Sequence, residues 1–135
     1  MTVAIQETAL GIGRTLDISF QKALDRTRRA LAAEEFGIIT EIDVKSTLRA
    51  KLGVEFTDYT ILGACAPPLA HRVLTVSPEM GLMLPCNVVV RDAGDGRIRV
   101  EAVRAQALAG LAGKAELQSV AREADDRLRR VIEAL

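Results

Sequence analysis

Leu82–Val103, which reads LMLPCNVVVRDAGDGRIRVEAV, is the stretch of sequence that decides the fold. Its first part, Leu82–Arg91, has the apolar composition of a strand, with Pro85 near the start, where an edge, a bulge or a strand end tolerates proline. Ala93–Gly96 is typical of a hairpin turn. Arg97–Val103 alternates polar and apolar residues, which predicts a half-solvated strand. The stretch therefore predicts an antiparallel β-hairpin.

The sequence before the hairpin predicts a strand-like arm at 1–9 and three further strands, because apolar residues alternate or run together in them. These strands are expected at 10–16, 38–42 and 59–65. Helices are expected where apolar residues recur every three or four positions. They are placed after a cap at Asp17 or Ser19, at 44–52 after a cap at Asp43, at 68–76, and at 115–135.

Two segments carry more specific expectations. The short helix after Asp43 is expected to turn Val44, Leu48 and Leu52 inward and to end at Gly53. The segment 105–113 is rich in alanine and glycine and fits either a loop or a helical turn.

These elements predict an α+β fold, with a mostly antiparallel sheet and helices packed on one face. The length of 135 residues is that of one domain, so we expect a single domain over 1–135.

Composition excludes several classes of protein. The net charge is zero and aromatic residues make up 3%, so we expect no binding of nucleic acid through basic patches or base stacking. No apolar run is long enough to span a membrane, and we expect no membrane partner. Two cysteines without a secretory signal favour the cytoplasm, where thiols stay reduced.

Three segments resemble the domain of unknown function 302 family: Glu35–Val44, Tyr59–Pro67 and Gly81–Val90. The resemblance covers about residues 10 to 103. It implies a TATA-binding-protein-like α+β fold with a strand-helix-four-strand-helix plan, and a homodimer. It implies no established activity and no known cofactor.

The chain departs from the pattern of the family it resembles at two places. Relatives usually read Cys-Asn-Pro where this chain has Cys65-Ala66-Pro67. They usually read Asp-Pro after the last strand, where this chain has Val103-Arg104-Ala105. A function that depends on the asparagine or the aspartate in relatives is therefore in doubt here.

Soft metal donors gather in one part of the chain, because Cys65, His71, Met80, Met83 and Cys86 fall within 22 residues. Thiolate, imidazole and thioether suit copper(I) or zinc. However, no Cys-x-x-Cys pair is present and the chain has a single histidine, so we assign no metal site. The alternative is a purely structural role, in which the cysteines pack as small apolar residues and the methionines fill gaps in the core.

Two cysteines flanked by prolines make the strongest candidate site. Cys65 ends a strand just before Pro67, and Cys86 begins one just after Pro85. A helix opening near Pro68 is expected to offer free amides that lower the pKa of a nearby thiol. The candidate ligand-binding residues are Cys65, Pro67, His71, Cys86 and Asn87, the last as a hydrogen-bond partner for a bound anion or carbonyl.

Three functions remain open. The first is the binding of a small ligand near the two cysteines. The second is a thiol-dependent enzyme in sulfur or redox chemistry, with His71 or Cys86 as the partner of Cys65. The third is a non-catalytic homodimeric interaction module that pairs through the strand 97–103, if that strand lies at an edge. The sequence assigns neither a catalytic residue nor a cofactor.

Overall fold

The structure is a computed structural model that describes residues 5–135. The N-terminal part of the expected arm, residues 1–4, lies outside the described residues. The strands are β1 (Gln6–Glu7), β2 (Gly11–Leu16), β3 (Gly37–Asp43), β4 (Tyr59–Cys65), β5 (Cys86–Asp92) and β6 (Ile98–Val103). The helices are α1 (Phe20–Ala33), α2 (Val44–Leu52), α3 (Pro67–Val76), α4 (Ala105–Ala112) and α5 (Glu116–Glu133), with a 3₁₀ helix, η1 (Pro78–Met83).

The strands form one antiparallel sheet with the order β1-β2-β6-β5-β4-β3. β5 and β6 form the predicted hairpin. Along the chain, β2, α1, β3, β4, β5, β6 and α5 follow the predicted strand-helix-four-strand-helix plan, and α2, α3 and α4 are insertions into it. The predicted α+β class is confirmed.

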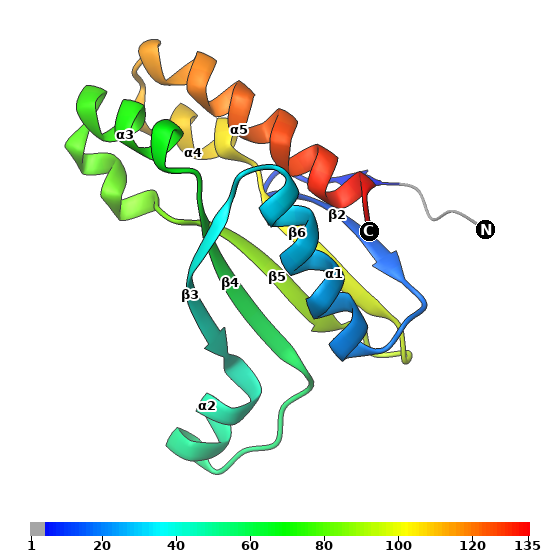
Figure 1. The fold of residues 1–135 in the computed structure, drawn as a ribbon. Coiled ribbons are helices and arrows are strands. Elements are labelled where there is room, and N and C mark those ends of the chain that lie inside the picture. The colour runs from blue at the N-terminus through cyan, green and yellow to red at the C-terminus, as the bar shows by residue number, and fades with distance from the viewer. Residues whose placement is uncertain (1–4) are drawn as a thin grey trace.

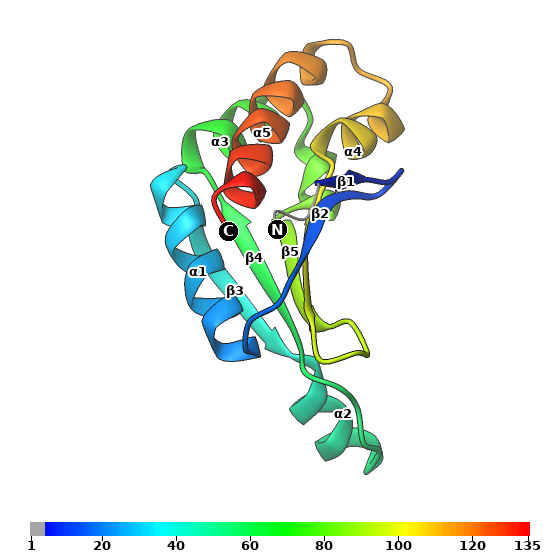
Figure 2. The same ribbon diagram turned by 90° about the vertical axis from the view of Figure 1, so that its right-hand side faces the viewer.

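The two long helices, α1 and α5, pack on the same face of the sheet (Figure 1), and the perpendicular view shows them both on that side (Figure 2). The register explains what they cover. Leu62, Val88, Ala102 and Ile12 lie opposite one another in a row across four strands, and all four are buried. The aliphatic core therefore lies between this face and the two helices.

Local signals set the helix boundaries as expected. The Ser19 hydroxyl accepts a hydrogen bond from the Lys22 amide at 3.2 Å and caps α1. The Asp43 carboxylate accepts one from the Ser46 amide at 3.0 Å and caps α2. Gly53 ends α2 with a φ of 66°, a left-handed conformation that favours glycine.

The environment of α2 was predicted wrongly. The helix projects away from the body of the protein (Figures 1 and 2) and has no buried residue. Leu52 is 68% exposed instead of packed inward. The amphipathic pattern was real, but α2 packs mainly against β3 and β4, which leave Val44 and Leu48 only partly covered.

Three other expectations change. The strand 97–103 is β6, which lies in the centre of the sheet rather than at an edge, so it cannot pair with a second chain. The strand expected from Leu82 begins only at Cys86, because residues up to Met83 belong to η1. The ambiguous segment 105–113 forms α4, which Gly113 ends with a φ of 68°.

Candidate functional site

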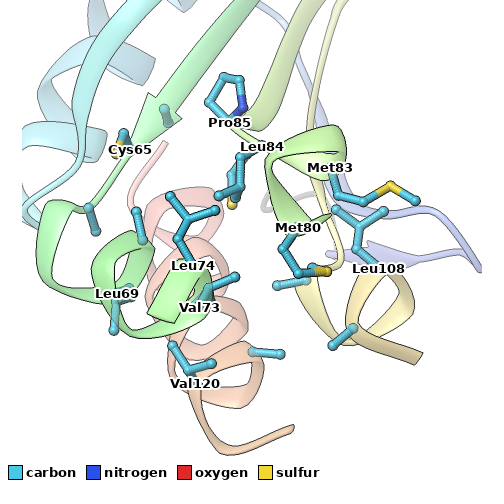
Figure 3. A pocket seen from close by; sticks show the side chains of 18 of the residues that line it. Cys65, Leu69, Val73, Leu74, Met80, Met83, Leu84, Pro85, Leu108 and Val120 are labelled. Carbon is cyan, nitrogen blue, oxygen red and sulfur yellow. The ribbon is translucent and has the colours of Figure 1, made fainter. Parts of the chain in front are cut away.

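A cavity of about 290 Å³ lies beside the ends of β4 and β5. Side chains from α3, η1, α4 and α5 surround it, among them Val73, Met80, Leu108 and Val120 (Figure 3). Ile39 and Leu74 also line it and are themselves exposed, so the cavity reaches the surface of the protein near them.

The cavity lies where two hydrophobic clusters meet. The main core includes Leu69 and Val120, and a smaller cluster consists of Met80, Ala109, Leu117 and Ala121. Small side chains leave the space between the clusters unfilled. Seven of the 21 lining residues are alanines: Ala64, Ala66, Ala70, Ala105, Ala109, Ala121 and Ala124.

The lining is apolar throughout. None of the 21 residues carries a charged, hydroxyl or amide side chain. Its only heteroatoms on side chains are sulfurs, from Cys65, Met80, Met83 and Cys86. Such a surface binds through shape and apolar contact, with thiols as the only and weak hydrogen-bond donors.

Prolines shape the chain around the cavity. Pro67 and Pro68 occupy the first positions of α3, where their fixed φ suits a helix start. Pro78 begins η1 directly after α3 ends at the buried Ser77. The Leu84–Pro85 peptide is cis and leads into β5. The short turns hold α3 and η1 as two walls of one hollow.

The start of α3 lacks the free amides that were expected there from the sequence. Pro67 and Pro68 have no amide hydrogen, and the amides of Leu69 and Ala70 both donate to the Ala66 carbonyl at 3.0 Å. The first turn therefore offers no free amide to a neighbouring sulfur.

Cys86 lies opposite Ala64 in the register of β4 and β5, so its side chain shares the helix-covered face with Val88. Burial raises the pKa of its thiol from 9.0 to about 11, and the charges of Asp125 and Cys65 add to the increase. Cys86 is therefore a neutral thiol at physiological pH, opposite to the activated thiol that the sequence suggested.

A buried carboxylate stands behind the wall formed by α4. Asp125, on α5, accepts hydrogen bonds from the amides of Ala105 at 2.5 Å and Gln106 at 3.1 Å. It thereby caps α4, whose own cap residue, Arg104, makes no such bond through its side chain. Burial raises the pKa of Asp125, while these two hydrogen bonds and Arg104 act to lower it.

The structure brings only part of the predicted site together. Cys65 and Cys86 line the same cavity and are both free thiols. Pro67, His71 and Asn87 are exposed and do not line it. A role for these three residues in ligand binding stays a prediction.

Sequence reasoning missed Asp125 and the alanines. Asp125 is buried together with Ala124 and Leu128, which belong to the apolar stripe of α5. Its position beside that stripe was the only sign in the sequence that its carboxylate is buried. The alanines of 105–113 were noticed only as an ambiguity. Their importance depends on which helices meet, which spacing does not reveal.

Among residues 5–135, no three His, Cys, Asp or Glu side chains come together in a group that could hold a metal ion. Within the same part of the chain, no helix combines the length and apolar character needed to cross a membrane.

Comparison with known proteins agrees with the resemblance seen in the sequence. The crystal structure of an uncharacterized conserved DUF302 protein from Bacillus stearothermophilus is similar, with a TM-score of 0.84 and 26% identity. The match covers 90% of this chain and 94% of that one. No curated protein matches the chain. The family model described as "Domain of unknown function DUF302" matches residues 12–135, and the chain therefore belongs to the DUF302 family.

Proposed function

We propose that this protein binds a small apolar molecule in the cavity between α3, η1, α4 and α5. One observation carries the proposal: a hollow of about 290 Å³ whose lining holds no polar side chain other than two thiols. Small-molecule sites are typically concave and mostly apolar, with volumes from roughly 300 Å³ upward. The volume of this cavity is close to the lower limit of that range, so the bound ligand is small.

Lost packing contacts around the cavity support an occupant. Apolar side chains that line unfilled space have no partner atoms on that side and lose the dispersion contacts they would otherwise make. A bound apolar ligand regains the lost contacts and stabilises the fold.

A thiol-dependent enzyme is a weaker candidate for this site. Such an enzyme needs a base or a resolving thiol beside its nucleophile. No lining residue is a base, His71 is exposed outside the cavity, and the raised pKa of Cys86 keeps it protonated.

We also propose a cytoplasmic location, because the two cysteines are free thiols.

The test is binding of 1-naphthylamine, an uncharged dye of about the size of the cavity whose fluorescence changes in apolar surroundings. We expect saturable binding to the wild-type protein, and a loss of about tenfold or more in Ala121→Leu, since leucine fills the cavity. Ala32→Leu, at an exposed position of α1, is the matched control and binds like the wild type. Absence of binding, or equal binding by Ala121→Leu, contradicts the proposal.

A homodimeric interaction module is a second candidate, and a different observation favours it. Apolar side chains stand exposed on α2 and the segment that follows it: Leu52 (68%), Val54 (43%) and Phe56 (42%). They continue onto the edge strand β3 through Ile42 (46%). Exposed apolar side chains that stand so close together in the chain favour an interaction site, and β3 has one unpaired edge.

Light scattering at several protein concentrations tests the dimer. The expected mass is twice the 14.6 kDa of one chain, and Leu52→Arg combined with Phe56→Ser lowers it toward a single chain. Leu82→Arg, at an exposed apolar position of η1 far along the chain from α2, is the control and leaves the mass unchanged. A single-chain mass for the wild type at high concentration excludes this candidate.

A further inference from the structure

One charged residue, Asp125, is buried close to the cavity, although no charged residue lines it. Asp125 follows the lining residue Ala124 on α5 and binds the amides at the start of α4, itself a wall of the cavity. It is 8% exposed, so water screens its charge poorly. The carboxylate is held just behind the lining, and the two backbone amides that it binds favour its charged form.

The Asp125 carboxylate lies close to the cavity, because the Ala105 amide that it binds at 2.5 Å belongs to a lining residue. Cys86 lines the cavity, and the Asp125 charge is the second cause, after burial, of the increase in its pKa. No cation is among the causes of that increase. An anion bound near Ala105 would therefore lie close to a buried carboxylate, which would repel it.

Three arginines stand next to lining residues, and none of them lines the cavity: Arg72, Arg104 and Arg122. Arg122 is exposed, so water screens its charge. Arg104 partly offsets the charge of Asp125, but its guanidinium donates to the Thr8 carbonyl at 3.1 Å, toward the N-terminal segment. Arg72, next to the lining residue Val73, pairs with Glu123 at 3.4 Å. Neither side chain lines the cavity, so neither compensates an anion within it.

We infer that the ligand is an uncharged aliphatic molecule of about ten carbons, and that Asp125 makes the cavity reject carboxylates of the same size. The size follows from the volume, because 290 Å³ holds about ten groups of the volume of a water molecule. The charge preference follows from the poorly screened carboxylate behind the wall and from the high cost of moving an ion into an apolar site. The inference rests on the proposed function, since it specifies the chemistry of the same site.

The experiment compares 1-decanol with decanoate at pH 7.5 as competitors that displace 1-naphthylamine. The proteins are the wild type, Asp125→Asn and Asp126→Asn. Asp126 is the adjacent, exposed carboxylate of α5 and controls for the loss of a charge from that helix. Asparagine keeps the shape of aspartate at position 125 and still accepts a hydrogen bond from α4.

In the wild type we expect 1-decanol to bind about tenfold or more tightly than decanoate. In Asp125→Asn the ratio falls by about tenfold, because decanoate binds better once the buried charge is gone. In Asp126→Asn the ratio stays at the wild-type value.

Three results contradict the inference: decanoate equal to or tighter than 1-decanol in the wild type, failure of both to displace a bound dye, or an unchanged ratio in Asp125→Asn. The first two need no variant, so they decide even if Asp125→Asn does not fold. Failure of the dye itself to bind is a separate outcome, and it refutes the proposed function together with this inference.

Discussion

Cys65 and Cys86 line one cavity from two neighbouring strands, and Cys86 lies directly opposite Ala64, the residue that precedes Cys65. They are close in the fold although 21 positions separate them in the sequence. Both stand as free thiols in an apolar wall, and burial makes Cys86 a poor acid. The burial of Cys86 therefore determines how readily its thiol ionises.

Cys86 is expected to react slowly with thiol reagents. A pKa of about 11 in place of 9.0 reduces the thiolate fraction below pH 9 by roughly 100-fold. In Cys65→Ser, labelling by iodoacetamide at pH 8 should therefore be about 100-fold slower than that of a small free thiol. The same variant unfolded in guanidinium is the control and labels at the rate of the free thiol. Equal rates for the folded and the unfolded protein contradict the burial of Cys86.

The Cys86 thiol also makes stability depend on alkaline pH. Because its pKa is higher in the folded than in the unfolded chain, its contribution is complete below pH 9 and is lost as the pH rises through about 11. A shift of this size corresponds to about 3 kcal/mol in the free energy of unfolding. Urea unfolding between pH 8 and 11 measures it.

Cys86→Ala is the comparison for that measurement, because other groups also titrate in this range. The stability of the wild type should fall more steeply between pH 9 and 11 than that of Cys86→Ala. Parallel curves for the two proteins would show that Cys86 has an ordinary pKa in the folded state.

Gly63, in β4, allows close packing beside the cavity. A Cβ atom added there would lie 2.7 Å from Cγ of Pro85 and would also collide with the Thr40 side chain on β3. Gly63→Ala should therefore lower the free energy of unfolding by about 1–3 kcal/mol.

Gly110 provides the matched control for Gly63. It lies within α4, and a Cβ atom added there meets nothing within 4 Å. Gly110→Ala should leave stability unchanged or raise it by up to about 1 kcal/mol, because alanine favours a helix. Thermal and urea unfolding of both variants check the pair, and equal effects would argue against the packing around Gly63.

Most of the fold could be predicted because its signals are local. Ser19, Asp43 and Gly53 act as helix caps through chemistry confined to a few neighbouring residues. The strand 59–65 was predicted with the bounds that β4 has, because turn residues and prolines flank a run of apolar residues. The hairpin at 93–96 is likewise a local feature.

The errors concern relations between elements that are distant in sequence. Alternation in 97–103 predicted a half-solvated strand and left its place in the sheet open, but β2 and β5 pair with β6 on both sides and most of its residues are buried. The apolar residues of α2 predicted burial, yet β3 and β4 cover Val44 and Leu48 only partly and Leu52 stays exposed. Periodicity shows which residues share a face, and it does not show what covers that face.

The candidate site was predicted in part for the same reason. Cys65 and Cys86 were singled out from their positions at strand ends, and they do line the cavity. The hollow itself arises because alanines from β4, α3, α4 and α5 meet, a property of the assembled elements. Asp125 could be recognised only once its contact with the start of α4 was known.

The central claim is that the cavity binds a small uncharged apolar molecule, and the methionine methyl groups report on it directly. The chain has three methionines, of which Met80 and Met83 line the cavity and Met1 lies outside the described residues. In protein labelled with carbon-13 at the methionine methyls, titration with 1-decanol should shift the Met80 and Met83 signals saturably, at one ligand per chain. Ala121→Leu should abolish these shifts. Met80 and Met83 signals that stay in place in the wild type, or that move equally in Ala121→Leu, would contradict the account.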